Sequence, residues 1–123
     1  MVFDVICEQG PVCFTVVPLG TKINQDTYWD MVSSHVLPRI RQYETQPGAL
    51  KVIFQEDGAS SHKAMATIDR FRRAKVTLLS WPARSPDLSP IESFWGIMKG
   101  HLAKDPPMNL HGLKQKVQNY WPW

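Results

Sequence analysis

The chain has 123 residues and a mass of 14.1 kDa, enough for a single domain. Its residues are 43% hydrophobic and 20% charged, an ordinary globular composition that excludes an intrinsically disordered chain. No apolar run is long enough to span a bilayer, and no early Lys or Arg marks a signal peptide. Cys7 and Cys13 are the two cysteines, which excludes a disulfide-rich scaffold and argues against zinc. We expect a soluble intracellular domain.

Charge is divided unevenly along the chain, although the net charge is only +3. Residues 1–57 carry four Lys or Arg against seven Asp or Glu, whereas residues 58–123 carry ten against four. A basic C-terminal half suits a polyanionic partner, although a modest basic excess is also common on solvated surfaces.

The first half predicts a hairpin and a helix. Apolar runs at 1–7 and 12–17 flank a Gly-Pro turn, which is typical of an antiparallel hairpin. Asn24 is a candidate N-cap for a helix whose apolar residues recur at helical spacing. Pro38 is expected to kink or end that helix.

The second half predicts alternating strands and helices. Buried-type strands are expected at 51–55 and 76–79, separated by a helix that Ser60 or Ser61 would cap. A proline-rich loop precedes a helix from Pro90 to about residue 102, and a last amphipathic helix covers 110–120. This order indicates an α/β fold with a mixed sheet, in one domain over residues 1–123.

Two carboxylates stand at positions suited to metal chemistry. Asp57 directly follows the first buried-type strand, and Glu92 lies in the first turn of the helix that begins at Pro90. Two such carboxylates on one sheet edge would hold Mg²⁺, which takes oxygen ligands and leaves room for water and phosphate. Both positions also have a purely structural interpretation. Asp57 suits an Asp-Gly turn, and Ser89 with Glu92 suits a capping box.

Two long motifs carry a family resemblance. The segment from Phe54 to Ala64, FQEDGASSHKA, resembles the second-aspartate motif of mariner/Tc-type transposases. The segment from Trp81 to Gly96, WPARSPDLSPIESFWG, resembles their third-acid motif, and 34 residues separate Asp57 from Glu92, the interval of the Tc-type branch. The hairpin and first helix, residues 1–40, also resemble that family.

The resemblance implies a ribonuclease H-like mixed sheet with flanking helices, lacking its first, central strand. It implies cutting and joining of DNA with Mg²⁺ (or Mn²⁺), with Asp57 and Glu92 as the second and third acids of an Asp-Asp-Glu set. We expect the first aspartate and the DNA-binding helices to lie outside this chain. Asp4, where the family more often has glycine, is a weak candidate replacement, and an edge-facing or hydrated carboxylate is the expected alternative.

The implied partners are transposon ends and target DNA in the nucleus, with no membrane and with homo-oligomerisation left open. Candidate DNA-binding residues share a positive charge or match a family histidine: His62, Arg70, Arg72, Arg73, Lys75, Arg84 and Lys99. The competing hypotheses are a catalytically inactive transposon-derived DNA-binding remnant and a relic without a biochemical role. Trp81 and Trp95 are expected in the core.

Overall fold

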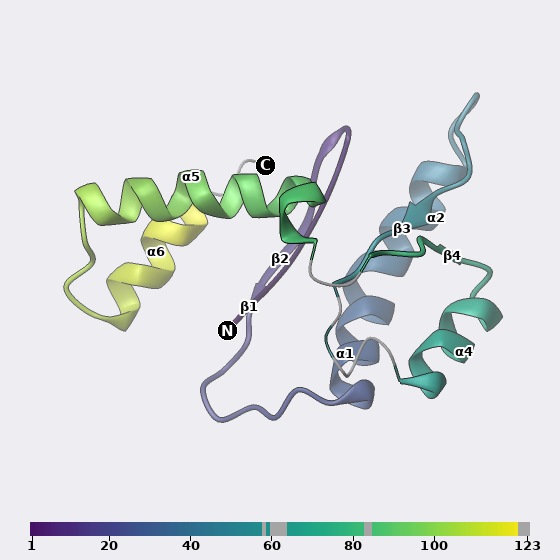
Figure 1. The fold of residues 1–123 in the computed structure, drawn as a ribbon, viewed down its shortest axis with the longest axis horizontal. Coiled ribbons are helices and arrows are strands. Elements are labelled where there is room, and N and C mark those ends of the chain that lie inside the picture. The colour runs from purple at the N-terminus through teal and green to yellow at the C-terminus, as the bar shows by residue number, and fades with distance from the viewer. Residues whose placement is uncertain (58, 60–63, 83–84, 121–123) are drawn as a thin grey trace. The chain divides into compact units, whose positions relative to one another are not determined.

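The computed structural model describes residues 1–57, 59, 64–82 and 85–120 (Figure 1). Its elements, in chain order, are β1 (Val2–Cys7), β2 (Gly10–Val16), α1 (Gln25–Met31), the π-helix η1 (Val32–Val36), α2 (Leu37–Glu44), β3 (Ile53–Phe54), α4 (Met65–Arg73), β4 (Thr77–Leu78), the 3-10 helix η2 (Pro86–Leu88), α5 (Pro90–Lys104) and α6 (Leu110–Tyr120). None of the described helices is long and apolar enough to cross a membrane.

The chain divides into two compact units. One unit combines Met1–Val17 with Ser85–Trp123, and the other is the continuous segment Pro18–Arg84. The described strands form two separate two-stranded sheets, β1 with β2 and β3 with β4. The expectation of a single domain over the whole chain stays a prediction.

The discontinuous unit joins the hairpin to the two C-terminal helices. β1 and β2 pair antiparallel with a bulge between Val5 and Ile6, and Gly10 takes a positive φ of 119° at the turn. The core of this unit contains Met98 from α5 and Val117 from α6. Half-buried apolar residues pack against them: Ile6, Phe14, Phe94, Trp95, Leu102 and Leu113. The predicted hairpin and the core position of Trp95 are therefore confirmed.

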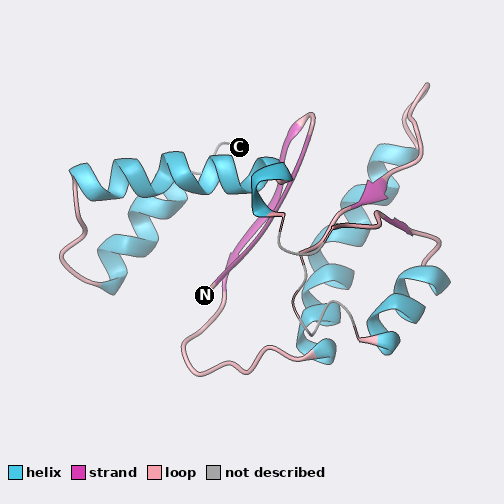
Figure 2. Ribbon diagram, viewed as in Figure 1, coloured by secondary structure: helices cyan, strands magenta, loops and turns pink. Residues whose placement is uncertain are grey.

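The continuous unit is built around Phe71 of α4, whose side chain is fully buried. Phe54 of β3 stacks on its ring at 5.3 Å, and Trp29 of α1 meets it edge-on at 5.2 Å. β3 pairs parallel to β4 through Ile53 with Thr77 and Phe54 with Leu78. Figure 2 shows how short these two strands are beside the hairpin. The stacked aromatic rings, rather than a long ladder, hold α4 against α1 and β3.

One prediction for this unit is wrong in detail, and another loses one of its two alternatives. Pro38 does not end the helical run, because α1 continues through the π-helix η1 into α2, and Pro38 takes a first-turn position of α2, where its missing N–H is not needed. A kink at Pro38 stays a prediction. The strand expected at 51–55 shortens to Ile53–Phe54, and Ile53 is 59% exposed. By contrast, the Asn24 cap is confirmed, since its Oδ1 accepts from the Asp26 and Thr27 amides.

Candidate active site

Asp57 lies three residues beyond the carboxyl end of β3, and its side chain is exposed. The Asp57 Oδ1 atom accepts a hydrogen bond of 2.9 Å from the Ala59 amide, which closes a local Asx turn. The turn interpretation of Asp57 is thus correct for Oδ1. The Asx turn also orients the Asp57 carboxylate, since the backbone amide two residues later fixes one of its oxygens. Gly58, next in the motif, lies outside the described residues.

A partly buried hydrogen bond supports the segment between β3 and Asp57. The Tyr28 hydroxyl on α1 donates to Glu56 Oε2 at 2.6 Å, and Tyr28 is only 2% exposed. Burial, followed by the hydrogen bond to Glu56, raises the pKa of Tyr28 well above its usual range, so the hydroxyl stays protonated and remains a donor. Sequence reasoning missed this pair because the partners are 28 positions apart and no local pattern links them.

Replacing Tyr28 with phenylalanine is expected to cost about 1–3 kcal/mol of unfolding free energy, since Glu56 loses a partly buried partner. Urea denaturation followed by circular dichroism measures this. Thr45→Ala is the matched control, because the Thr45 hydroxyl bonds locally to the Gln42 carbonyl on an exposed surface. An equal loss of stability in both variants would contradict the supporting role of Tyr28.

Glu92 is the third residue of α5 and its side chain is exposed. Ser89 occupies the N-cap position, but its side chain makes no capping hydrogen bond, and the Glu92 amide bonds to the Ser89 carbonyl instead. The capping-box interpretation is therefore wrong, because Pro90 and the backbone close the first turn without the serine hydroxyl. Glu92 still benefits from the positive end of the α5 dipole.

Asp4 of β1 lies in the same unit as Glu92 and is not the hydrated carboxylate expected from the sequence. Its Oδ2 is enclosed and has no hydrogen-bond partner in the described part of the chain, whereas the Trp95 side chain hydrogen-bonds to the carboxylate. Burial raises the pKa of Asp4 to about 6, and the negative charge of Glu92 adds to that increase. The role of Asp4 as a replacement metal ligand stays a prediction.

The raised pKa of Asp4 makes folding pH-dependent. Its folded pKa of about 6 exceeds the usual aspartate value of 3.8, so the associated stability is complete below pH ~4 and is lost as pH rises through ~6. Asp4→Asn is expected to remove about 1–2 kcal/mol of this decline, less than the full shift implies because solvent screens the partly exposed carboxylate. Urea midpoints at pH 4 and pH 7.5, measured with EDTA, test it. Parallel pH profiles for both proteins would contradict the expectation.

The candidate DNA-binding residues fall into three groups. His62 and Arg84 lie outside the described residues. Arg70 is held within its own unit, since its guanidinium pairs with Asp26 at 2.7 Å and also donates to the Gln25 carbonyl. Arg72, Arg73 and Lys75 are exposed at the end of α4, and Lys99 is exposed on α5. Arg70 thus ties α4 to α1, which sequence spacing alone does not reveal.

Asp57 and Glu92 belong to different units, and each unit is described by itself. No group of three or more His, Cys, Asp or Glu placed to hold a metal occurs among the described residues. Convergence of the two carboxylates on one cation stays a prediction.

Known proteins similar to this chain agree with the motifs. A family model of the DDE superfamily endonucleases matches residues 6–113. The Tc3 transposase of Caenorhabditis elegans is 38% identical over 80 residues, which cover 65% of this chain and 23% of that protein. The Tc1 transposase of the same organism is 27% identical over 111 residues, covering 89% of this chain and 41% of that protein. The chain thus spans less than half the length of these relatives.

Solved structures show the fold. The catalytic domain of Mos1 mariner transposase superposes with a TM-score of 0.75 at 24% identity, covering 91% of this chain and 56% of that chain. Similar structures include that domain with Mg and with Mn, and a Mos1 paired-end complex with the left transposon end. The fold is accordingly an incomplete, ribonuclease H-like α/β arrangement. The chain belongs to the DDE superfamily of endonucleases, and it is similar to transposases of the mariner/Tc type.

Proposed function

We propose that this chain is part of a catalytic domain that cuts and joins DNA during transposition, in the nucleus, with Asp57 and Glu92 as two of its metal-binding carboxylates. The observation that carries the proposal is the position of both acids. Asp57 stands beyond the carboxyl end of β3 in a fixed turn, and Glu92 stands exposed at the start of α5 without a serine cap. Transposon ends and target DNA are the proposed substrates.

The residues present fit a hard divalent cation. Both are carboxylates with exposed side chains, and Mg²⁺ typically takes one or two protein carboxylates together with water and phosphate oxygens. When bound, such a cation would polarise the scissile phosphodiester and activate the attacking hydroxyl. The chain itself contributes the negative charge of Asp57 and Glu92, the turn that orients Asp57, and the Tyr28–Glu56 bond behind it.

Iron-directed cleavage of the chain tests whether the two carboxylates share a cation. Fe²⁺ replaces Mg²⁺ at oxygen-rich sites, and with ascorbate and peroxide it generates radicals that cut the nearby backbone. We expect cuts near both 57 and 92, competed by Mg²⁺, and both should disappear in either Asp57→Asn or Glu92→Gln. Asp87→Asn, an exposed carboxylate on η2, is the control that keeps both cuts. Cuts at one position only, or cuts unaffected by the substitutions, would overturn the shared site.

A catalytically inactive DNA-binding remnant is the second candidate function. It is favoured by the exposed cations at the end of α4, which need no metal. The iron experiment separates the two, because a remnant with scattered carboxylates gives no coupled cuts.

A further inference from the structure

Helix α4 ends in a Schellman motif whose left-handed position is a lysine. The Val76 amide bonds to the Phe71 carbonyl at 3.0 Å, and the Lys75 amide bonds to the Arg72 carbonyl at 3.0 Å. Lys75 accordingly has a φ of 58°, and it is the only non-glycine residue with positive φ in the described part of the chain. Glycine is the usual residue there, because any side chain raises the energy of this conformation. A lysine therefore occupies a position where folding favours glycine.

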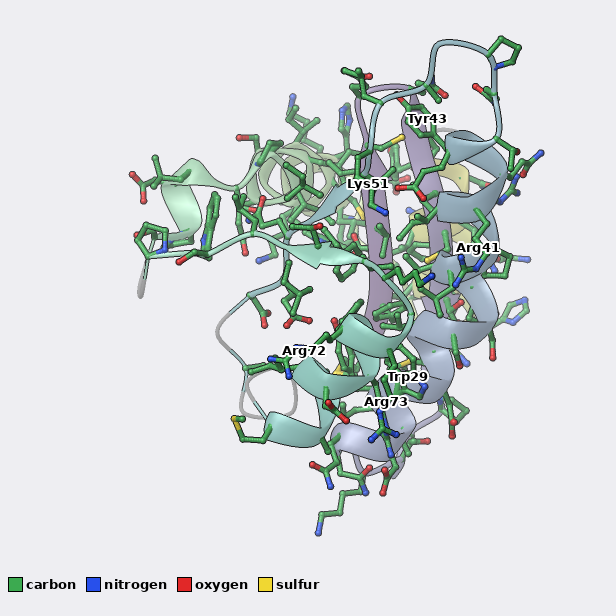
Figure 3. The ribbon with its side chains drawn as sticks, turned by 90° about the vertical axis from the view of Figure 1, so that its right-hand side faces the viewer. Trp29, Arg41, Tyr43, Lys51, Arg72 and Arg73 are labelled. Carbon is green, nitrogen blue, oxygen red and sulfur yellow. The ribbon has the colours of Figure 1, made fainter. Side chains whose placement is uncertain are left out.

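Three arginines lie near Lys75 in the sequence or through a contact with its neighbour Ala74. Arg72 and Arg73 occupy the last turn of α4, and their side chains are 74% and 81% exposed. Arg41 reaches across from α2, and its guanidinium donates to the Ala74 carbonyl at 3.2 Å, next to Lys75. Figure 3 shows Arg41, Arg72 and Arg73 on the side of this unit formed by α2 and α4. Together Arg41, Arg72, Arg73 and Lys75 are called the α4 basic cluster.

Local acids do not neutralise the α4 basic cluster. Asp69 lies 3.0 Å from Arg73 and 3.8 Å from Arg72, so one carboxylate serves two guanidiniums. Each guanidinium has five N–H donors, so donors remain available beyond Asp69 and the Ala74 carbonyl. Cations at a helix C-terminus also complement the helix dipole, which explains Arg72 and Arg73 in structural terms. The dipole does not explain why Lys75 stands in a left-handed conformation.

We propose that the α4 basic cluster is a binding surface for the phosphodiester backbone of duplex DNA, separate from the candidate metal site. The inference rests on the proposed function, which makes DNA the polyanion concerned. Exposed guanidinium and ammonium groups bind phosphate oxygens of the DNA backbone, and such contacts carry no sequence information directly. The surface therefore holds and orients DNA, and leaves sequence recognition to other parts of the protein.

Fluorescence anisotropy with two unrelated 20-base-pair duplexes, in EDTA and at several NaCl concentrations, tests the surface. Lys75→Gly and Arg73→Gln should each weaken binding about fivefold to tenfold at ~0.1 M salt and lower the slope of log K against log salt by about one. Lys75→Arg should retain wild-type affinity. Lys75→Gly should not lower the thermal midpoint, because glycine suits the left-handed position. If Lys75 had only a structural role, Lys75→Gly would not lower DNA affinity while leaving the thermal midpoint unchanged.

Lys22→Gly is the matched control, since Lys22 is an exposed lysine of the same unit and has no positive φ. It removes the same charge with the same residue change and should alter affinity by less than twofold. Equal effects of Lys22→Gly and Lys75→Gly, or no binding of either duplex by the wild-type chain, would overturn the surface. Neither result touches the iron-directed cuts at 57 and 92, so failure of this surface and failure of the proposed function are distinguishable.

Discussion

Replacing Phe71 with alanine is expected to unfold the Pro18–Arg84 unit, with a loss of about 3–5 kcal/mol. Phe71 is fully buried, and the rings of Trp29 and Phe54 both lie against it, so the truncated side chain leaves a cavity between three elements. Domains of this size are stable by only about 5–15 kcal/mol, so the loss removes much of the total. Urea denaturation followed by tryptophan fluorescence measures the change.

Met65→Ala is the control for that experiment. Met65 lies in the same helix, but its side chain is 76% exposed, so its loss should change stability by less than about 0.5 kcal/mol. If Phe71→Ala were as mild as Met65→Ala, the aromatic cluster would not be the core that holds α4 in place.

The 123-residue chain alone is expected to leave a supercoiled plasmid intact in the presence of Mg²⁺. Two-metal phosphodiester chemistry needs enough carboxylate charge to hold both ions, and only Asp57 and Glu92 match the acids of the family motif here. Gel electrophoresis of the plasmid after incubation, with Mg²⁺ or with Mn²⁺, measures nicking. The expected rate equals that of an Asp57→Ala variant.

Nicking by the wild-type chain that disappears in Asp57→Ala would contradict this expectation. A second variant, Asp4→Asn, is informative in the same assay. Asp4 lies early in the chain, and the negative charge of Glu92 contributes to its raised pKa. Loss of nicking in Asp4→Asn as well would identify Asp4 as the third acid.

Local signals predicted local structure well. The Gly10–Pro11 turn between two apolar runs gave the hairpin, and Asn24 gave a true helix cap, because both depend on residues within a few positions of each other. Of the two outcomes predicted for Pro38, the end of the helix is excluded, since the π-helix η1 leads directly into α2. The strand around Phe54 was predicted too long because strand length depends on a partner strand, which local hydrophobicity does not specify.

The two acids of the candidate site stay a prediction from the motifs, and the contacts around them were not predicted. The motifs single out Asp57 and Glu92, and the family comparison agrees with those motifs. Three contacts join residues that are distant in sequence: the Tyr28–Glu56 hydrogen bond, the Arg70–Asp26 ion pair and the hydrogen bond of the Asp4 carboxylate with Trp95. Each depends on how elements pack, so no spacing rule along the chain would have found it.

The division of the chain into a continuous and a discontinuous unit has a consequence for synthesis on the ribosome. The Pro18–Arg84 unit contains all its own partners and is able to fold as soon as that segment has emerged. The hairpin is made before the segment that contains its apolar partners Met98 and Val117, and closing the intervening loop has an entropic cost. The hairpin therefore lacks its core until α5 and α6 have been made. A nascent chain stalled just after Arg84 has emerged from the ribosome should expose the hairpin's apolar face to chaperones and proteases, while the Phe71 core is already closed.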